Sequence, residues 1–139
     1  MNKKTKEGLE KFITEVYQNA KNHGWHEEKR EVGTVIALMH SELSEALEFA
    51  RNEKQLNKKG INALFHYSGT NEQGKEVLSN EITLFTKKPD GYLVELADVV
   101  IRIFDEVGSK GLETEFIEKL LEKHEYNKTR EFKHGNKRF

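Results

Sequence analysis

Residues 91–108, GYLVELADVVIRIFDEVG, decide the fold class because they are apolar on nearly every side of a helix. The main apolar stripe of this segment has helical spacing and consists of Leu93, Leu96, Ala97, Val100, Ile103, Phe104 and Val107. The stripe is widened on both flanks by Val94, Val99 and Ile101. A helix that is apolar on nearly all sides is buried, so we expect this segment in the core of a helical protein.

Three further segments carry a helical pattern of apolar residues. We expect Gly24 to cap the first of them and Gly108 to end the helix described above. The second has the longest stripe: Val32, Val35, Ile36, Met39, Leu43, Ala46, Leu47 and Ala50. The predicted fold class is therefore all-α, with a four-helix bundle-like core over about 5–22, 28–51, 91–108 and 112–127.

The helical pattern is lost between residues 52 and 90, where glycines recur at positions 60, 69 and 74. The runs ALFHY at 63–67 and EITLFT at 81–86 could pair as a small hairpin. We interpret 52–90 as an irregular insertion or lid, since long structureless loops are uncommon inside compact domains. The tail at 128–139 is basic, and the whole chain, 1–139, is expected to be a single helical domain.

The composition excludes several classes of protein. The chain has 23 Lys and Arg against 24 Asp and Glu, a formal net charge of −1, which gives no attraction to duplex nucleic acid or anionic lipid. No run approaches the roughly 18–20 apolar residues that span a bilayer. The absence of cysteine excludes disulfides and thiolate catalysis, and MNKKTKEGLEKF does not resemble a secretory signal. We expect a cytoplasmic protein that does not enter the membrane.

Two acidic pairs lie within apolar helical segments, although burying a lone carboxylate costs several kcal/mol. Glu42 and Glu45 belong to HSELSEALEFA, residues 40–50, and Glu95 and Asp98 to VELADVVIRIF. Members of each pair are three residues apart, so both point to one side of their helix, about 60° from each other. Either pair alone is more often a solvated helix face. Two such pairs favour a four-carboxylate site, which suits Mg²⁺, or Mn²⁺ as the alternative.

ELSEALEFAR followed by ELADVVIRIFD resembles the Glu-x-x-Glu … Glu-x-x-Asp signature of the MazG-like, all-α nucleoside triphosphate pyrophosphohydrolases. The resemblance implies that Mg²⁺-dependent hydrolysis splits the substrate between its α and β phosphorus atoms, giving a monophosphate and pyrophosphate. It assigns the catalytic metal ligands to Glu42, Glu45, Glu95 and Asp98. The later segment KHEYNKTREFKHG resembles a nucleotide-contacting Lys-x-x-x-Asn segment, which implies substrate contacts by Lys123, Asn127 and Arg130. About fifty residues separate the two acidic motifs, more than in compact members of that family.

Arg102 continues the narrow polar strip that Glu95, Asp98 and Asp105 form on their helix. We expect it to pair with Asp98 four residues earlier, or to join Lys128 in binding phosphate. Helices with two apolar faces each leave surface to bury, so a homodimer or homotetramer is expected. Two alternatives stay open. One is a noncatalytic helical module with a structural cation or solvated acidic faces, and the other is a nucleic-acid-associated protein acting through its basic tail.

Overall fold

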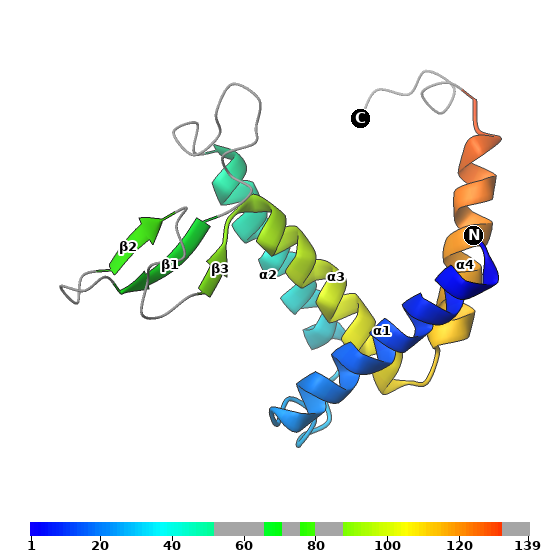
Figure 1. Cartoon of the computed structure of the whole chain (residues 1–139), viewed down its shortest axis with the longest axis horizontal. Coiled ribbons are helices and arrows are strands. Elements are labelled where there is room, and N and C mark those ends of the chain that lie inside the picture. The colour runs from blue at the N-terminus through cyan, green and yellow to red at the C-terminus, as the bar shows by residue number, and fades with distance from the viewer. Residues whose placement is uncertain (52–65, 71–75, 80–87, 132–139) are drawn as a thin grey trace. The chain divides into compact units, whose positions relative to one another are not determined.

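The computed structural model describes residues 1–51, 66–70, 76–79 and 88–131. Most of these residues are helical, which confirms the predicted all-α class. The helices that the structure describes are α1 (Lys3–Asn22), α2 (Val32–Arg51), α3 (Tyr92–Ser109) and α4 (Glu113–Lys128) (Figure 1). None of the helices in this part of the chain has the length and apolar character needed to cross a lipid bilayer.

A small antiparallel sheet occurs in the chain between α2 and α3 (Figure 1). It has the order β2-β1-β3, with β1 at His66–Thr70, β2 at Glu76–Ser79 and β3 at Lys88–Asp90. A small hairpin is present in this segment, and it joins β1, which overlaps the first predicted run at His66 and Tyr67, to β2. The run at 81–86, which we predicted as the second strand, lies outside the described residues.

Both ends of α1 follow from local capping chemistry. The Asn2 side chain accepts a hydrogen bond from the Thr5 backbone N–H at 2.9 Å, as an N-cap residue does. At the other end Gly24 has φ +81°, and the Gly24 and Trp25 N–H groups donate to the carbonyls of Lys21 and Ala20. This is the Schellman arrangement, in which glycine accepts the left-handed backbone without strain. The predicted cap at Gly24 is confirmed.

α2 begins later than predicted, at Val32 instead of residue 28. Its first turn is closed by a hydrogen bond from the Val35 N–H to the Glu31 carbonyl at 3.1 Å. The four residues before the helix, 28–31, are all charged. They offer no apolar side chain to hold an additional turn against a neighbour, and packing of an apolar face supplies most helical stability in proteins.

Gly108 does not end α3, contrary to our prediction. The helix continues to Ser109, and Gly111, with φ +64°, provides the C-terminal cap. Gly108 is instead buried inside the last turn, where a Cβ atom would lie 2.7 Å from Tyr17 Cβ and 3.2 Å from the Ile13 carbonyl oxygen. The glycine is therefore required for the close approach of α1 to α3, and not for chain reversal.

The chain divides into two compact units. The first comprises Met1–Glu27 and Phe104–Phe139, and the second comprises Glu28–Ile103. In the first unit Ile13 and Ile117 are fully buried. The Phe104 ring there meets the rings of Phe12 and Phe116 edge-on, at centroid distances of 6.0 and 6.3 Å. Such edge-to-face pairs stabilise a core beyond the burial of their area.

The surface of the first unit adds polar contacts between α1 and α4. Lys6 Nζ donates to Glu118 at 3.0 Å, and Thr114 Oγ1 donates to Glu10 at 2.9 Å. In the second unit α2 runs beside the first turns of α3 (Figure 1). That pair of helices carries the candidate site. The expectation that residues 1–139 form a single domain stays a prediction.

Candidate metal centre

α2 buries a glutamate and exposes leucines. Val35, Glu42 and Ala46 are its buried residues, and their spacing of seven and four places them on one face. Only 7 % of Glu42 is exposed, whereas Leu43 and Leu47 are 43 % and 46 % exposed. From the sequence we expected the apolar stripe that includes both leucines to face the core. The buried face is instead one edge of that stripe, at Val35 and Ala46, and it carries Glu42 of the first acidic motif inward.

α3 supplies the second acidic motif from its first two turns. Glu95 is 5 % exposed, and Asp98, one turn later, is partly buried. The opposite side of the same turns is apolar and half-exposed, at Leu93 and Val100. α3 therefore uses its narrow polar strip, and not its apolar stripe, to face inward at this position.

Residues of the two acidic motifs lie close together in the structure. One carboxylate oxygen each from Glu42, Glu95 and Asp98 lies within 4.8 Å of the others, close enough for the three to bind one cation. Glu45, the fourth predicted ligand, is exposed and is not part of this group. It lies about 60° from Glu42 around α2, on the side away from the buried Ala46.

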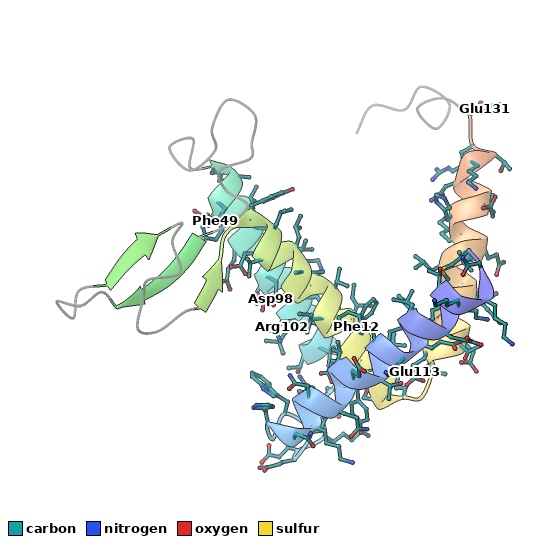
Figure 2. All side chains as sticks on the ribbon, in the orientation of Figure 1. Phe12, Phe49, Asp98, Arg102, Glu113 and Glu131 are labelled. Atoms are coloured by element: carbon teal, nitrogen blue, oxygen red, sulfur yellow. The ribbon has the colours of Figure 1, made fainter. Side chains whose placement is uncertain are left out.

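Arg102 joins the cluster from α3. Its Nε donates a hydrogen bond of 2.7 Å to Glu42 Oε1, and its Nη2 forms an ion pair with the same oxygen. Figure 2 labels Arg102 and Asp98 on α3, where they are one helical turn apart. We expected the guanidinium to pair with Asp98 on its own helix, but it reaches Glu42 on the neighbouring one. Charge-assisted contacts of this kind are stronger than those between neutral groups.

The charges in the cluster make a cation favourable. Two unit negative charges about 5 Å apart repel by about 3 kcal/mol at an effective dielectric constant of 20. Glu42, Glu95 and Asp98 form three such pairs. Arg102 brings one positive charge to Glu42. Hard oxygen ligands that converge from two helices are the donor set that Mg²⁺ and Mn²⁺ prefer.

The predicted nucleotide-contacting residues lie on the first unit. Lys123 and Asn127 are exposed on α4, and Arg130 is exposed just after the helix ends. Lys123 Nζ lies 4.9 Å from the centroid of the Tyr126 ring, a cation–π contact. Their role in binding nucleotide stays a prediction.

Ion pairs within α4 involve the neighbouring charges. Lys128 Nζ donates to Glu125 at 2.5 Å, so this phosphate-binding candidate already has a carboxylate partner. That hydrogen bond lowers the pKa of Glu125 below its usual range. The hydrogen bond between Lys119 and Glu122 lowers the pKa of Glu122 and raises that of Lys119. All four side chains are exposed to solvent, where such pairs contribute little to stability.

Two polar side-chain contacts of α3 were not predicted from the sequence. Besides the pair of Arg102 with Glu42, His26 Nε2 lies 2.6 Å from Oδ1 of the buried Asp105, and the Tyr17 ring meets the imidazole edge-on. Both contacts involve the polar strip of α3, to which Arg102 and Asp105 belong. That strip was the available signal. No pattern in the sequence identifies its partners, which are Glu42 on α2 and His26 in the turn after α1.

No protein-family model matches the chain, and the searches of curated proteins and of solved structures also gave no match. The functional interpretation therefore depends on the two acidic motifs and on the geometry that joins three of their four residues.

Proposed function

We propose that this protein is a Mg²⁺-dependent, MazG-like nucleotide pyrophosphohydrolase, which converts a nucleoside triphosphate or deoxynucleoside triphosphate to the monophosphate and pyrophosphate. The observation that carries the proposal is the meeting of Glu42, Glu95 and Asp98, two of them buried, from motifs separated by about fifty residues. Burying a carboxylate is costly unless it is paired or binds a metal, and here two buried carboxylates and a partly buried one come together at one point.

The carboxylates would act as the metal-binding part of the enzyme. A bound Mg²⁺, or Mn²⁺ in its place, would neutralise triphosphate charge and activate a water for in-line attack. Glu42, Glu95 and Asp98 would hold the cation. The exposed Glu45 would complete the ligand set from the solvent side or accept the proton of the attacking water.

Lys123, Asn127 and Arg130 would contact the nucleotide, as the family resemblance implies. Two of these side chains are cationic, and phosphoryl transfer is catalysed mainly by positioning and by neutralisation of charge. Their exposure in the described part of the chain leaves them available for a ligand.

A second copy of the chain is the proposed protein partner, in a homodimer or a homotetramer in the cytoplasm. The second unit leaves half-exposed apolar side chains on both α2 and α3: Val32, Ile36, Leu43, Leu47, Leu93, Val100 and Ile101. These side chains carry no charge, so the same side chains of a second copy are suitable partners in a two-fold interface. Burying the exposed half of one leucine contributes about 1 kcal/mol.

The proposal is tested by product analysis. Purified protein is incubated with Mg²⁺ and each member of a panel of ribo- and deoxyribonucleoside triphosphates, and the products are separated. We expect monophosphate and pyrophosphate from at least one substrate, with no product when EDTA replaces Mg²⁺. Diphosphate and orthophosphate would show cleavage of the other bond and would contradict the proposal.

A matched pair of glutamine variants tests the site itself. Glu95→Gln removes a buried member of the cluster and should lower turnover by about 100-fold or more. Glu48→Gln removes an exposed carboxylate of α2, 3.3 Å from Arg51, and should leave turnover unchanged. Far-ultraviolet circular dichroism verifies that both variants are folded. Wild-type turnover in Glu95→Gln would exclude Glu95 as a metal ligand.

The noncatalytic alternative is favoured by one observation. Arg102 already satisfies the buried carboxylate of Glu42, so the contact between α2 and α3 does not need a substrate. A helical module with a structural cation would release no pyrophosphate from any nucleotide. Nucleotides would then leave its melting temperature unchanged in the presence of Mg²⁺, whereas an enzyme that binds them would be stabilised.

A further inference from the structure

The Arg102 guanidinium and a divalent cation would need the same carboxylate. Two guanidinium nitrogens, Nε and Nη2, converge on a single oxygen of Glu42, and that residue is one of the three that lie within reach of a common cation. We propose that Arg102 is a built-in counter-ion of the cluster, which a divalent cation must displace from Glu42. The inference rests on the proposed metal site and adds to it a residue that sets its affinity.

The geometry shows which partner would move. The Glu42 side chain is 9 % exposed and lies on the buried face of α2, so it has little room to turn. The Arg102 side chain is 26 % exposed, and its long stem allows the guanidinium to swing toward solvent while the methylene groups stay packed. Cation binding would therefore exchange the partner of Glu42 and release the guanidinium.

The exchange has a thermodynamic consequence. If the metal and the guanidinium compete for Glu42, the ion pair between Glu42 and Arg102 must be broken when the metal binds. The free energy of that ion pair is then lost, and the observed affinity for the metal is lower for that reason. Coupling between two such events is typically about 5- to 150-fold in affinity. Removing the guanidinium should therefore tighten metal binding, although it removes a stabilising contact from the metal-free protein.

A merely structural ion pair predicts the opposite result. If Arg102 only joins α2 to α3 and thereby holds the carboxylates in place, its loss loosens the cluster and weakens metal binding. Melting temperature alone does not separate the two roles, because both predict a less stable metal-free protein. The direction of the change in metal affinity separates them.

The experiment titrates wild-type protein and variants with Mn²⁺ alone at neutral pH and low salt, and measures free Mn²⁺ by electron paramagnetic resonance. Arg102→Gln removes the charge, and Arg102→Lys keeps a charge but loses the paired donors that converge on Glu42. The matched control is Arg51→Gln, which removes the same charge from an exposed ion pair with Glu48 on α2. The melting temperature of each protein is recorded with and without Mn²⁺.

We expect Arg102→Gln to bind Mn²⁺ about 10-fold more tightly than wild type, and Arg102→Lys to fall between them. Arg51→Gln should stay within about twofold of wild type, because exposed charges interact weakly. Arg102→Gln should melt at a lower temperature than wild type without metal and gain more from Mn²⁺. If Arg102→Gln does not fold, Arg102→Lys provides the test, because it too should bind Mn²⁺ more tightly than wild type.

Two outcomes would overturn the inference, and they are distinguishable. If wild type binds Mn²⁺ and neither Arg102 variant binds more tightly, Arg102 is not a competing counter-ion, but the metal site stands. If neither wild type nor any variant binds Mn²⁺ at millimolar concentration, the metal site and the proposed function fail together.

Discussion

The close approach of α1 to α3 at Gly108 gives a prediction with two opposing contributions. Alanine at this position gains up to about 1 kcal/mol of helix propensity over glycine. Its Cβ, however, would lie 2.7 Å from Tyr17 Cβ and 3.2 Å from the Ile13 carbonyl oxygen. Carbon atoms pack best at about 3.5–4.0 Å, and both neighbours belong to α1 near its backbone, so neither can turn away as the end of a long side chain could.

The steric contribution should exceed the gain in propensity. Overpacking a core typically costs about 1–3 kcal/mol, so we expect Gly108→Ala to lower the free energy of unfolding by about 1–2 kcal/mol. For a chain of this size that corresponds to a fall of about 4–8 °C in melting temperature. Thermal unfolding followed by circular dichroism at 222 nm measures it directly.

Gly8→Ala is the matched control for this prediction. Gly8 also lies inside a helix, but a Cβ there meets nothing within 4 Å. Alanine should therefore keep its propensity advantage of about 0.5–1 kcal/mol and raise the melting temperature by about 2–4 °C. If Gly108→Ala stabilises the protein as Gly8→Ala does, α1 does not pack against α3 at this point, and our explanation of Gly108 is wrong.

Three other predictions concern the partner surface, the metal and pH. Replacing the half-exposed Leu43 and Leu47 by glutamate should convert the proposed homodimer to a monomer in light scattering, whereas a dimer in that double variant would place the interface elsewhere. Millimolar Mg²⁺ should raise the melting temperature of wild type and not that of Glu95→Gln. Equal increases in both proteins would show that Mg²⁺ does not stabilise the protein by binding to the cluster. The lowered pKa of Glu125 means that its pair with Lys128 stabilises the fold at neutral pH and is lost as pH falls through that pKa. Glu125→Gln should thus melt slightly below wild type at pH 7 and equal to it in strong acid, and a difference that persists in acid would refute the assignment.

The helical segments were predictable because local chemistry specifies them. The cap at Gly24 and the strongly periodic apolar residues of 91–108 gave α1 and α3 nearly correct boundaries. The glycines near the end of α3 were harder to interpret. Gly108 and Gly111 are three residues apart, and either could cap a helix. Only the position of Tyr17 on α1 shows that Gly108 is needed for close packing.

The inward face of α2 was not predictable from hydrophobicity. A helical wheel selects the stripe through Leu43 and Leu47 as the buried one, because it weights each residue by its own transfer free energy. The chain instead turns Glu42 inward, where Arg102 of α3 pairs with it. The cost of burying the carboxylate is offset by a partner on another helix, and such compensation is invisible to a pattern read along one segment.

The candidate site was predictable in part. Spacing placed Glu95 and Asp98 on one side of α3 and Glu42 on one side of α2, and these three residues lie together. The same spacing grouped Glu45 with Glu42, but 60° around a helix is enough to carry a side chain from a buried contact to solvent. Spacing gives the side of a helix that a pair shares, and neighbouring helices determine which member is buried.

The most direct test of the metal site is anomalous X-ray diffraction from crystals grown with Mn²⁺. We predict an anomalous difference peak bound by carboxylate oxygens of Glu42, Glu95 and Asp98. Well-ordered crystals that show these three side chains clearly and have no peak between them at saturating Mn²⁺ would contradict the account.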